Sequence, residues 1–137
     1  MIRTMDVRCG MDIVDISRFV KIVKDDNTPF INKCFTEQEI GYCESSNNPE
    51  KKAERYAARF AAKEAVGKAL GTGLMSEGVG MHDIEVVKNG KGAPEIKLTG
   101  GALRHADEMG MVSVSISLSH DGGMAGAYCV MLLERPE

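Results

Sequence analysis

A long run of residues suited to a helix, ending at two glycines, places the strongest constraint on the fold of this chain. Residues 50–70 contain no proline, and Gly71 and Gly73 follow directly. Glycine adopts the left-handed backbone conformation that ends many helices at little cost, whereas other residues resist it. The sequence therefore predicts one long helix from about Glu50 to Leu70.

One ridge of this helix carries aromatic and charged side chains together. Tyr56, Phe60, Glu64 and Lys68 are four residues apart, so they lie along one face. Glu64 and Lys68 have two interpretations. They form a surface ion pair worth about 0.2–0.5 kcal/mol, which the spacing alone favours, or they belong to a site. Other segments of the chain have to decide between the two.

The first half of the chain holds a strand and two shorter helices besides the long one. Residues 7–13 have the pattern of a strand in which Gly10 permits close approach of a neighbouring backbone. Asp15 or Ser17 is suited to cap a helix that ends near Lys24. Residues 36–39 fit a capping box that opens another helix, which ends in the polar linker 45–49.

The second half is built mainly of strands. Residues 84–87 and 95–98 flank an Asn-Gly turn, which is a hairpin signal. Thr99 is suited to cap a helix that runs to Glu108. Apolar residues alternate with serines over 112–119, which is the period of a strand with one buried face.

The last strand completes the predicted fold. A turn at 121–123 leads into 124–133, which is apolar enough to lie in the interior of a sheet or against another subunit. The order of elements predicts an α+β fold, with a mainly antiparallel sheet and the long helix packed on it. With 137 residues, of which 43% are hydrophobic, we expect a single domain spanning residues 1–137.

Composition excludes several kinds of partner and location. The net charge of -3 gives no general attraction to nucleic acid or to an anionic membrane. The apolar runs are far shorter than a membrane span, and the first residues lack the apolar region of a signal peptide, so we expect a cytoplasmic protein. The cysteines have no paired spacing and no histidine at zinc-ligand distance, which predicts reduced and mostly buried thiols. They are Cys9, Cys34, Cys43 and Cys129.

Two carboxylates from distant parts of the sequence are suited to bind magnesium. Mg²⁺ is typically held by one or two protein carboxylates, with water and substrate phosphates in its other positions. Asp12 and Glu64 fit that requirement if the fold brings them together, although an unrelated surface acid and a helix ion pair explain them equally well. Arg59, Lys63 and Lys68 add positive charge. Because Arg59 and Lys63 are one turn apart, we expect at least one of them to face solvent or a neighbouring subunit.

Three segments together show a family resemblance. Residues 10–19, 59–73 and 117–120 resemble the holo-acyl-carrier-protein synthase type of 4'-phosphopantetheinyl transferase, in the order found in that family and over nearly the whole chain. The resemblance implies an enzyme that transfers 4'-phosphopantetheine from coenzyme A to a serine of apo acyl carrier protein. The products are the holo carrier protein and 3',5'-ADP, and the reaction supports fatty-acid biosynthesis.

The resemblance assigns catalytic roles to three residues. It implies that Asp12 and Glu64 hold Mg²⁺ as the cofactor. Glu64 is also the candidate for taking the serine proton, directly or through a metal-bound water. Lys68 is expected to stabilise charge on the diphosphate of coenzyme A.

The resemblance also implies contacts with coenzyme A and with other protein chains. The expected coenzyme contacts are Arg59, Lys68, Gly71, His120 and, in a turn that covers the nucleotide from an adjacent subunit, Asn89 and Pro94. Members of this short type are homotrimers with the coenzyme at subunit interfaces. Arg18 and Lys21, in a basic row that continues to Lys24, are expected to bind the acidic carrier protein, although a merely solvated face has the same pattern.

Two alternatives remain open at this stage. One is a non-catalytic module that binds coenzyme A or a nucleotide, and the other is a metal-dependent phosphoester hydrolase. The combination of metal ligands and a candidate base favours an enzyme over a binding module. One departure from the family pattern concerns the coenzyme, because residues 121–124 replace the more usual aromatic after His120.

Overall fold

The computed structural model describes residues 2–74 and 76–136, with only the backbone of Pro136. Its elements follow the predicted α+β order. They are β1 (Arg3–Asp15), α1 (Ile16–Lys24), α2 (Thr28–Cys34), α3 (Glu37–Glu44), α4 (Pro49–Leu70), a 3-10 helix (Met81–Asp83), β2 (Ile84–Lys88), β3 (Pro94–Leu98), α5 (Gly100–Met109), β4 (Met111–Asp121) and β5 (Met124–Pro136).

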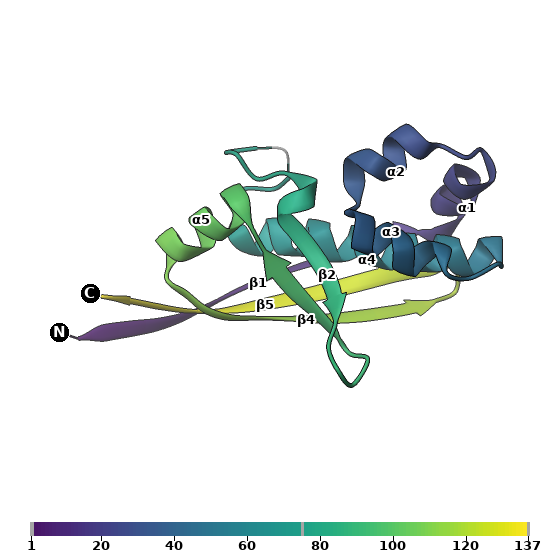
Figure 1. Ribbon diagram of the computed structural model, residues 1–137. Helices are drawn as coiled ribbons and strands as arrows, with labels where there is room; N and C mark the ends of the chain where they lie inside the picture. Colours follow the sequence, from purple (N-terminus) through teal and green to yellow (C-terminus); the bar gives the residue numbers. More distant parts are fainter. Residues whose placement is uncertain (1, 75, 137) are drawn as a thin grey trace.

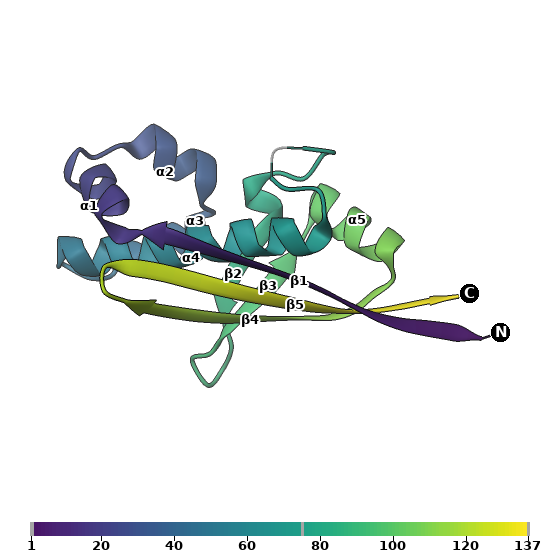
Figure 2. The same ribbon diagram turned by 180° about the vertical axis from the view of Figure 1, so that it is seen from behind.

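The three long strands form one antiparallel sheet in the order β1-β5-β4. The last strand therefore lies in the interior of the sheet, which confirms one of its two expected places. Alternate residues of β5 from Ala125 to Leu133 are buried, and α4 lies along that face of the sheet (Figure 1). Seen from behind, β1 and β5 run side by side to the end that holds both termini (Figure 2).

The close packing of α4 on β1 depends on Gly10. A Cβ atom at this position would collide with the carbonyl oxygen of Ala65 and the backbone nitrogen of Ala69. The predicted close approach is thus between β1 and the helix. At the other predicted glycine stop, Gly71 ends α4 in the left-handed conformation, with φ of 82°.

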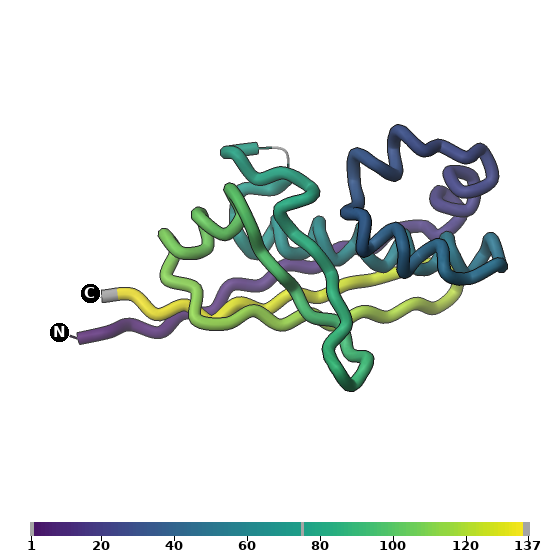
Figure 3. The backbone as a smooth tube through the Cα atoms, viewed as in Figure 1, coloured from purple at the N-terminus to yellow at the C-terminus, as the bar shows by residue number. Residues whose placement is uncertain are grey.

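The hairpin and the capping box form as predicted. β2 and β3 pair antiparallel in a small sheet of their own, and their turn projects past the edge of the large sheet (Figure 3). The hydroxyl of Thr36 accepts from the backbone N–H of Glu39, whose side chain accepts from the backbone N–H of Thr36. Thr99 precedes α5 as expected, but its side chain makes no capping hydrogen bond.

The helix α2 was missing from the sequence-based prediction. It is only seven residues long, and Asn27 caps it by accepting from the N–H of Phe30. Its stability comes from tertiary packing, because the ring of Phe30 lies 6.0 Å from Phe19 and 6.3 Å from Phe60 between ring centroids. A short helix held by contacts with distant segments leaves no periodic signal in its own sequence.

Neither Arg59 nor Lys63 faces solvent, because both side chains are buried, so the first of the two expected alternatives is wrong; that Arg59 faces a neighbouring subunit stays a prediction. Lys63 pairs with the buried carboxylate of Glu39 at 2.7 Å and donates to the carbonyl oxygens of Met81 and Ile84. These partners satisfy the ammonium group completely. Lys63 is therefore an internal link between α4, α3 and β2 and not part of a phosphate site.

The cysteines are free thiols; Cys9 is exposed and the other three are buried. Within the described residues, no helix is both long and apolar enough to cross a membrane.

Candidate functional site

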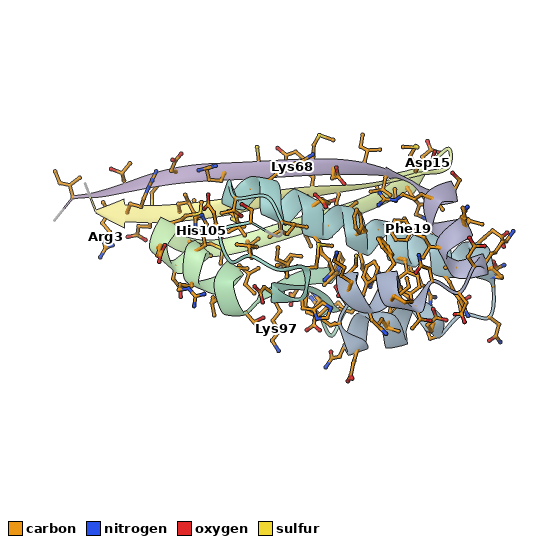
Figure 4. The ribbon with its side chains drawn as sticks, turned by 90° about the horizontal axis from the view of Figure 1, so that it is seen from above. Arg3, Asp15, Phe19, Lys68, Lys97 and His105 are labelled. Atoms are coloured by element: carbon orange, nitrogen blue, oxygen red, sulfur yellow. The ribbon has the colours of Figure 1, made fainter. Side chains whose placement is uncertain are left out.

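Asp12 and Lys68 meet where β1 passes beneath α4. Asp12 lies on the face of β1 that Gly10 and Val14 also occupy, so its side chain is directed toward the helix. The ammonium group of Lys68 donates to a carboxylate oxygen of Asp12 at 3.3 Å and to the carbonyl oxygen of Met11 at 2.9 Å. Figure 4 shows Lys68 beside β1. The sheet and the helix thus bring together two of the three predicted catalytic residues.

Glu64 belongs to the same group. Burial raises the pKa of its carboxyl above the ordinary value, and the negative charge of Asp12 raises it further, while Lys68 and Arg18 oppose the shift. Among the described residues, Lys68 forms its ion pair with Asp12 and not with Glu64. The surface ion pair along the helix is therefore not the arrangement that the structure contains.

The chemistry of this group fits a divalent cation. Two carboxylates that repel each other gain from a shared positive ion, and Mg²⁺ accepts two protein oxygens when water and phosphate fill its other positions. No cluster of three or more acidic, histidine or cysteine ligands occurs in residues 2–74 and 76–136.

A second group of predicted residues gathers on the other flank of α4. Arg59 and His120 line one pocket, and Arg59 and Pro94 line the next. Arg59 is only 5% exposed, and its guanidinium carbon lies 4.0 Å from the centroid of the Tyr42 ring. These contacts join α4, the end of β4 and the hairpin. Three of the predicted coenzyme contacts therefore share one surface region.

The group around Glu64 and the group around Arg59 lie on different sides of α4. Arg59 and Glu64 are five residues apart on α4, which turns the helix by about 140°. Asp12 on β1 and Leu118 on β4 pair with the same residue of the central strand β5. Two strand spacings, or about 10 Å, therefore separate Asp12 from Leu118, which lines a pocket together with Arg59. Within one chain, the fold does not unite all the predicted residues in a single pocket.

The remaining predicted residues lie near one or the other group. Gly71 is three residues after Lys68, at the end of α4, where it adjoins the guanidinium group of Arg8. The amide of Asn89 accepts from the backbone N–H groups of Lys91 and Ala93, so it stabilises its own turn. Both positions are compatible with contacts to a bound coenzyme.

Arg18 lies close to the first group, which the sequence did not indicate. Its guanidinium carbon is 5.1 Å from the ring centroid of Phe60, one turn before Glu64 on the helix. Lys21 instead faces solvent and lies 3.9 Å from Asp25. Of the two predicted carrier contacts, Arg18 is thus the one beside the candidate active site.

Sequence reasoning missed two sets of residues around these groups. A mainly apolar pocket has Glu64 and Lys33 in its lining, together with Phe30, Cys34, Phe60, Leu74 and Met81. The ring of Tyr42, which Arg59 contacts, also contacts Arg55 and Lys88. Arg55 and Arg59 share a helix ridge and were open to detection by their spacing. Tyr42 and Lys88 come from separate elements, so only the tertiary fold brings them there.

Comparison with known proteins connects this geometry to one family. Residues 8–129 match the 4'-phosphopantetheinyl transferase superfamily. The holo-acyl-carrier-protein synthase of Geobacter sulfurreducens is 45% identical over 93% of this chain and 96% of its own length. That of Geotalea daltonii is 46% identical over 89% and 94%, respectively.

Solved structures give the same result for the fold. The Helicobacter pylori holo-acyl-carrier-protein synthase in complex with coenzyme A is 35% identical, with a TM-score of 0.76 over 90% of this chain and 98% of that one. The Plasmodium yoelii acyl carrier protein synthase with ADP bound is 31% identical, with a TM-score of 0.80 over 95% and 98%. The predicted resemblance is confirmed: this chain belongs to the 4'-phosphopantetheinyl transferase superfamily.

Proposed function

We propose that this protein transfers the 4'-phosphopantetheine group from coenzyme A to a serine hydroxyl of apo acyl carrier protein, releasing 3',5'-ADP. The observation that carries the proposal is the ion pair of Asp12 on β1 with Lys68 on α4, where Glu64 lies one turn before Lys68 on the same face of the helix. Relatives that share more than two fifths of the sequence are named for this reaction. Fatty-acid biosynthesis in the cytoplasm is the setting that we propose for it.

The residues of the first group have complementary roles in such a transfer. Asp12 and Glu64 would hold Mg²⁺, which would supply positive charge to neutralise the diphosphate of the coenzyme. The ammonium group of Lys68 contacts Asp12 in this structure. From this position it would also pair with the negative charge of a bound diphosphate. Glu64 would accept the serine proton directly or through a water.

The test is intact mass spectrometry of an apo acyl carrier protein incubated with this protein, coenzyme A and Mg²⁺. We expect the carrier to gain one phosphopantetheinyl group, and we expect EDTA to abolish the gain. An unmodified carrier with intact coenzyme bound would support the binding module instead. Hydrolysis of the coenzyme without any change in the carrier would support the hydrolase. A gain that persists in EDTA would contradict the role of the metal.

We also propose that the protein acts as a homotrimer. The face of the sheet turned away from α4 exposes apolar side chains on β1 and β5, as a subunit interface requires. They are Met5, Val7, Met11, Ile13, Met124, Tyr128 and Val130, each at least 36% exposed. This apolar face and the family resemblance support the trimer.

Assembly of several copies would also bring the group around Glu64 together with the group around Arg59. Because Glu64 and Arg59 project from different sides of α4 within one chain, we infer that the metal group of one copy and the Arg59 group of the next copy complete one coenzyme site. Mixing the inactive variants Glu64→Gln and Arg59→Gln, with subunit exchange, should then restore about a quarter of wild-type activity, because some interfaces regain both intact halves. A mixture that stays inactive would place the whole site within one chain.

Arg18 is the residue that we propose for docking the acidic carrier protein. Arg18→Ala should raise the KM for the carrier about two- to tenfold at low ionic strength, and the effect should shrink in high salt as charges are screened. Lys24→Ala on the same exposed helix is the matched control and should have the smaller effect. A loss that does not depend on salt would assign Arg18 to packing against Phe60 and its neighbours.

A further inference from the structure

An exposed arginine on β1 lies beside the end of α4 without a carboxylate partner. The Nη2 atom of Arg8 is 2.9 Å from the position that a Cβ atom of Gly71 would occupy. Asp6, two residues earlier on the same face of β1, is already held by Arg135 at 2.8 Å and by the N–H of Val7. Within residues 2–74 and 76–136, Arg8 forms no ion pair. Its guanidinium group is therefore available to an anion.

Carbonyl oxygens at the end of α4 already have other partners. Positive side chains commonly bind such oxygens and stabilise the helix end. Here the N–H of Gly71 donates to the carbonyl oxygens of Gly67 and Lys68. The Nε2 atom of His105 lies 3.1 Å from the carbonyl oxygen of Leu70. Stabilising the helix end thus does not explain why an arginine stands beside it.

The strand β1 and the helix α4 run in opposite directions along their contact, which sets the order of the functional groups. Arg8 adjoins the end of α4, and Asp12 pairs with Lys68 one turn earlier. Farther along, Arg18 on α1 lies beside Phe60, about two turns before Lys68. The metal group therefore lies between the proposed carrier-docking residue and Arg8.

This order determines the side on which the nucleotide leaves in the transfer proposed above. The attacking and leaving oxygens of a phosphoryl transfer lie roughly in line, on opposite sides of the phosphorus. A carrier protein docked at Arg18 brings its serine to the metal group from the side of Phe60. The leaving nucleotide then lies on the side of Gly71, where the guanidinium group of Arg8 is located.

The phosphate that leaves with the nucleotide gains negative charge during the reaction. The serine oxygen forms a bond to the phosphorus that bears pantetheine, and the serine proton goes to Glu64 or to a water. The bond from that phosphorus to the bridging oxygen breaks, and its electron pair stays on this oxygen. The 5'-phosphate thus changes from a monoanion within the diphosphate to a dianion in 3',5'-ADP. A cation beside it stabilises the breaking bond more than the bound substrate.

We propose that Arg8 binds the 5'-phosphate of the nucleotide and stabilises its charge as it leaves, which makes Arg8 a further catalytic residue. Arg8 and Asp12 lie on the same face of β1 with about 13 Å between their Cα atoms, so Arg8 reaches the leaving phosphate and not the metal. The guanidinium fork is suited to two phosphate oxygens at once. The catalytic role rests on the proposed function, whereas the affinity of Arg8 for a nucleotide 5'-phosphate does not.

Single-turnover rates of carrier modification test the catalytic role. Arg8→Gln should lower the rate at saturating coenzyme A about tenfold or more, because a hydrogen bond to a charged group is lost. The coenzyme concentration that gives half the maximal rate should change much less. Arg8→Lys should recover part of the rate, since lysine keeps the charge but not the fork. Arg104→Gln, an exposed position on α5 at the same end of α4, is the matched control and should alter neither value. A loss confined to the half-saturating concentration would overturn the catalytic role.

Calorimetry with two nucleotides tests the contact without any transfer, because 3',5'-ADP carries the 5'-phosphate and adenosine 3'-monophosphate lacks it. Arg8→Gln should weaken the binding of 3',5'-ADP about tenfold and leave both the binding of the monophosphate and the urea midpoint unchanged. Equal weakening for both nucleotides, or none, would overturn the proposal. A lower urea midpoint with unchanged nucleotide affinity would assign Arg8 to the helix end instead. If Arg8→Gln shows the predicted selective loss but the wild-type protein modifies no carrier, the phosphate contact stands and the proposed function fails.

Discussion

Replacing Glu64 with glutamine is expected to lower the rate of phosphopantetheine transfer about 10²–10⁴-fold, which is the usual contribution of a general base. Glutamine keeps the size of the side chain but has no negative charge for the metal and no basic oxygen for the serine proton. Asp12→Asn should cause a loss of similar order. The double variant should be little worse than either single variant, because the two residues act as one unit.

The raised pKa of Glu64 predicts how the Glu64→Gln substitution changes the free energy of unfolding. Burial and the charge of Asp12 raise the pKa of Glu64 in the folded protein, so ionising Glu64 is less favourable there than in the unfolded chain. This penalty is absent well below the unfolded value of about 4.3 and is fully present above the folded pKa. Without Mg²⁺, the neutral Glu64→Gln protein should therefore be at least as stable as the wild-type protein at neutral pH.

The measurement combines initial rates from intact mass spectrometry with urea unfolding. Glu50→Gln, in the exposed first turn of the same helix, is the matched control and should transfer at nearly the wild-type rate. A Glu64→Gln protein that keeps a near-normal rate would remove Glu64 from both the metal site and the proton transfer. A rate loss accompanied by a lower urea midpoint would indicate damage to the fold instead.

The sequence predicted well those elements that carry a periodic pattern or a start or stop signal in their own residues. The alternation that ends at Ser119, the capping box at Thr36 and the glycine stop at Gly71 each report a local requirement of the backbone. The helix α2 has no such pattern, because contacts with Phe19 and Phe60 hold it in place. The sequence thus predicts elements that are stabilised locally and misses one that depends on distant packing.

The site shows the same division. The motif residues Asp12, Glu64 and Lys68 come together as the resemblance implied, because β1 and α4 pack in direct contact. That α4 separates this group from Arg59 depends on how the helix sits on the sheet, which spacing does not reveal. Tyr42 and Lys88 were missed because neither has a chemical signature until the fold places them beside Arg59.

The buried pair of Lys63 and Glu39 is the second place where a single substitution should have a large effect. Both side chains are fully buried. One oxygen of Glu39 accepts from Lys63 and from the backbone of Thr36, and the other accepts from the N–H of Val86. Burial lowers the pKa of Lys63, while the carboxylate of Glu39 opposes that shift. The ammonium group therefore depends on Glu39 to remain charged in the interior.

Lys63→Met should destabilise the fold by about 3–5 kcal/mol, because it leaves the carboxylate of Glu39 buried without a counter-charge. The double variant Lys63→Met/Glu39→Gln should recover much of this loss, since no unpaired charge remains. Urea unfolding of both proteins measures the difference. A stable Lys63→Met protein that fails to bind coenzyme A would return Lys63 to the phosphate site. A double variant no more stable than the single one would show that Lys63 acts through its hydrogen bonds to Met81 and Ile84 and not through its charge.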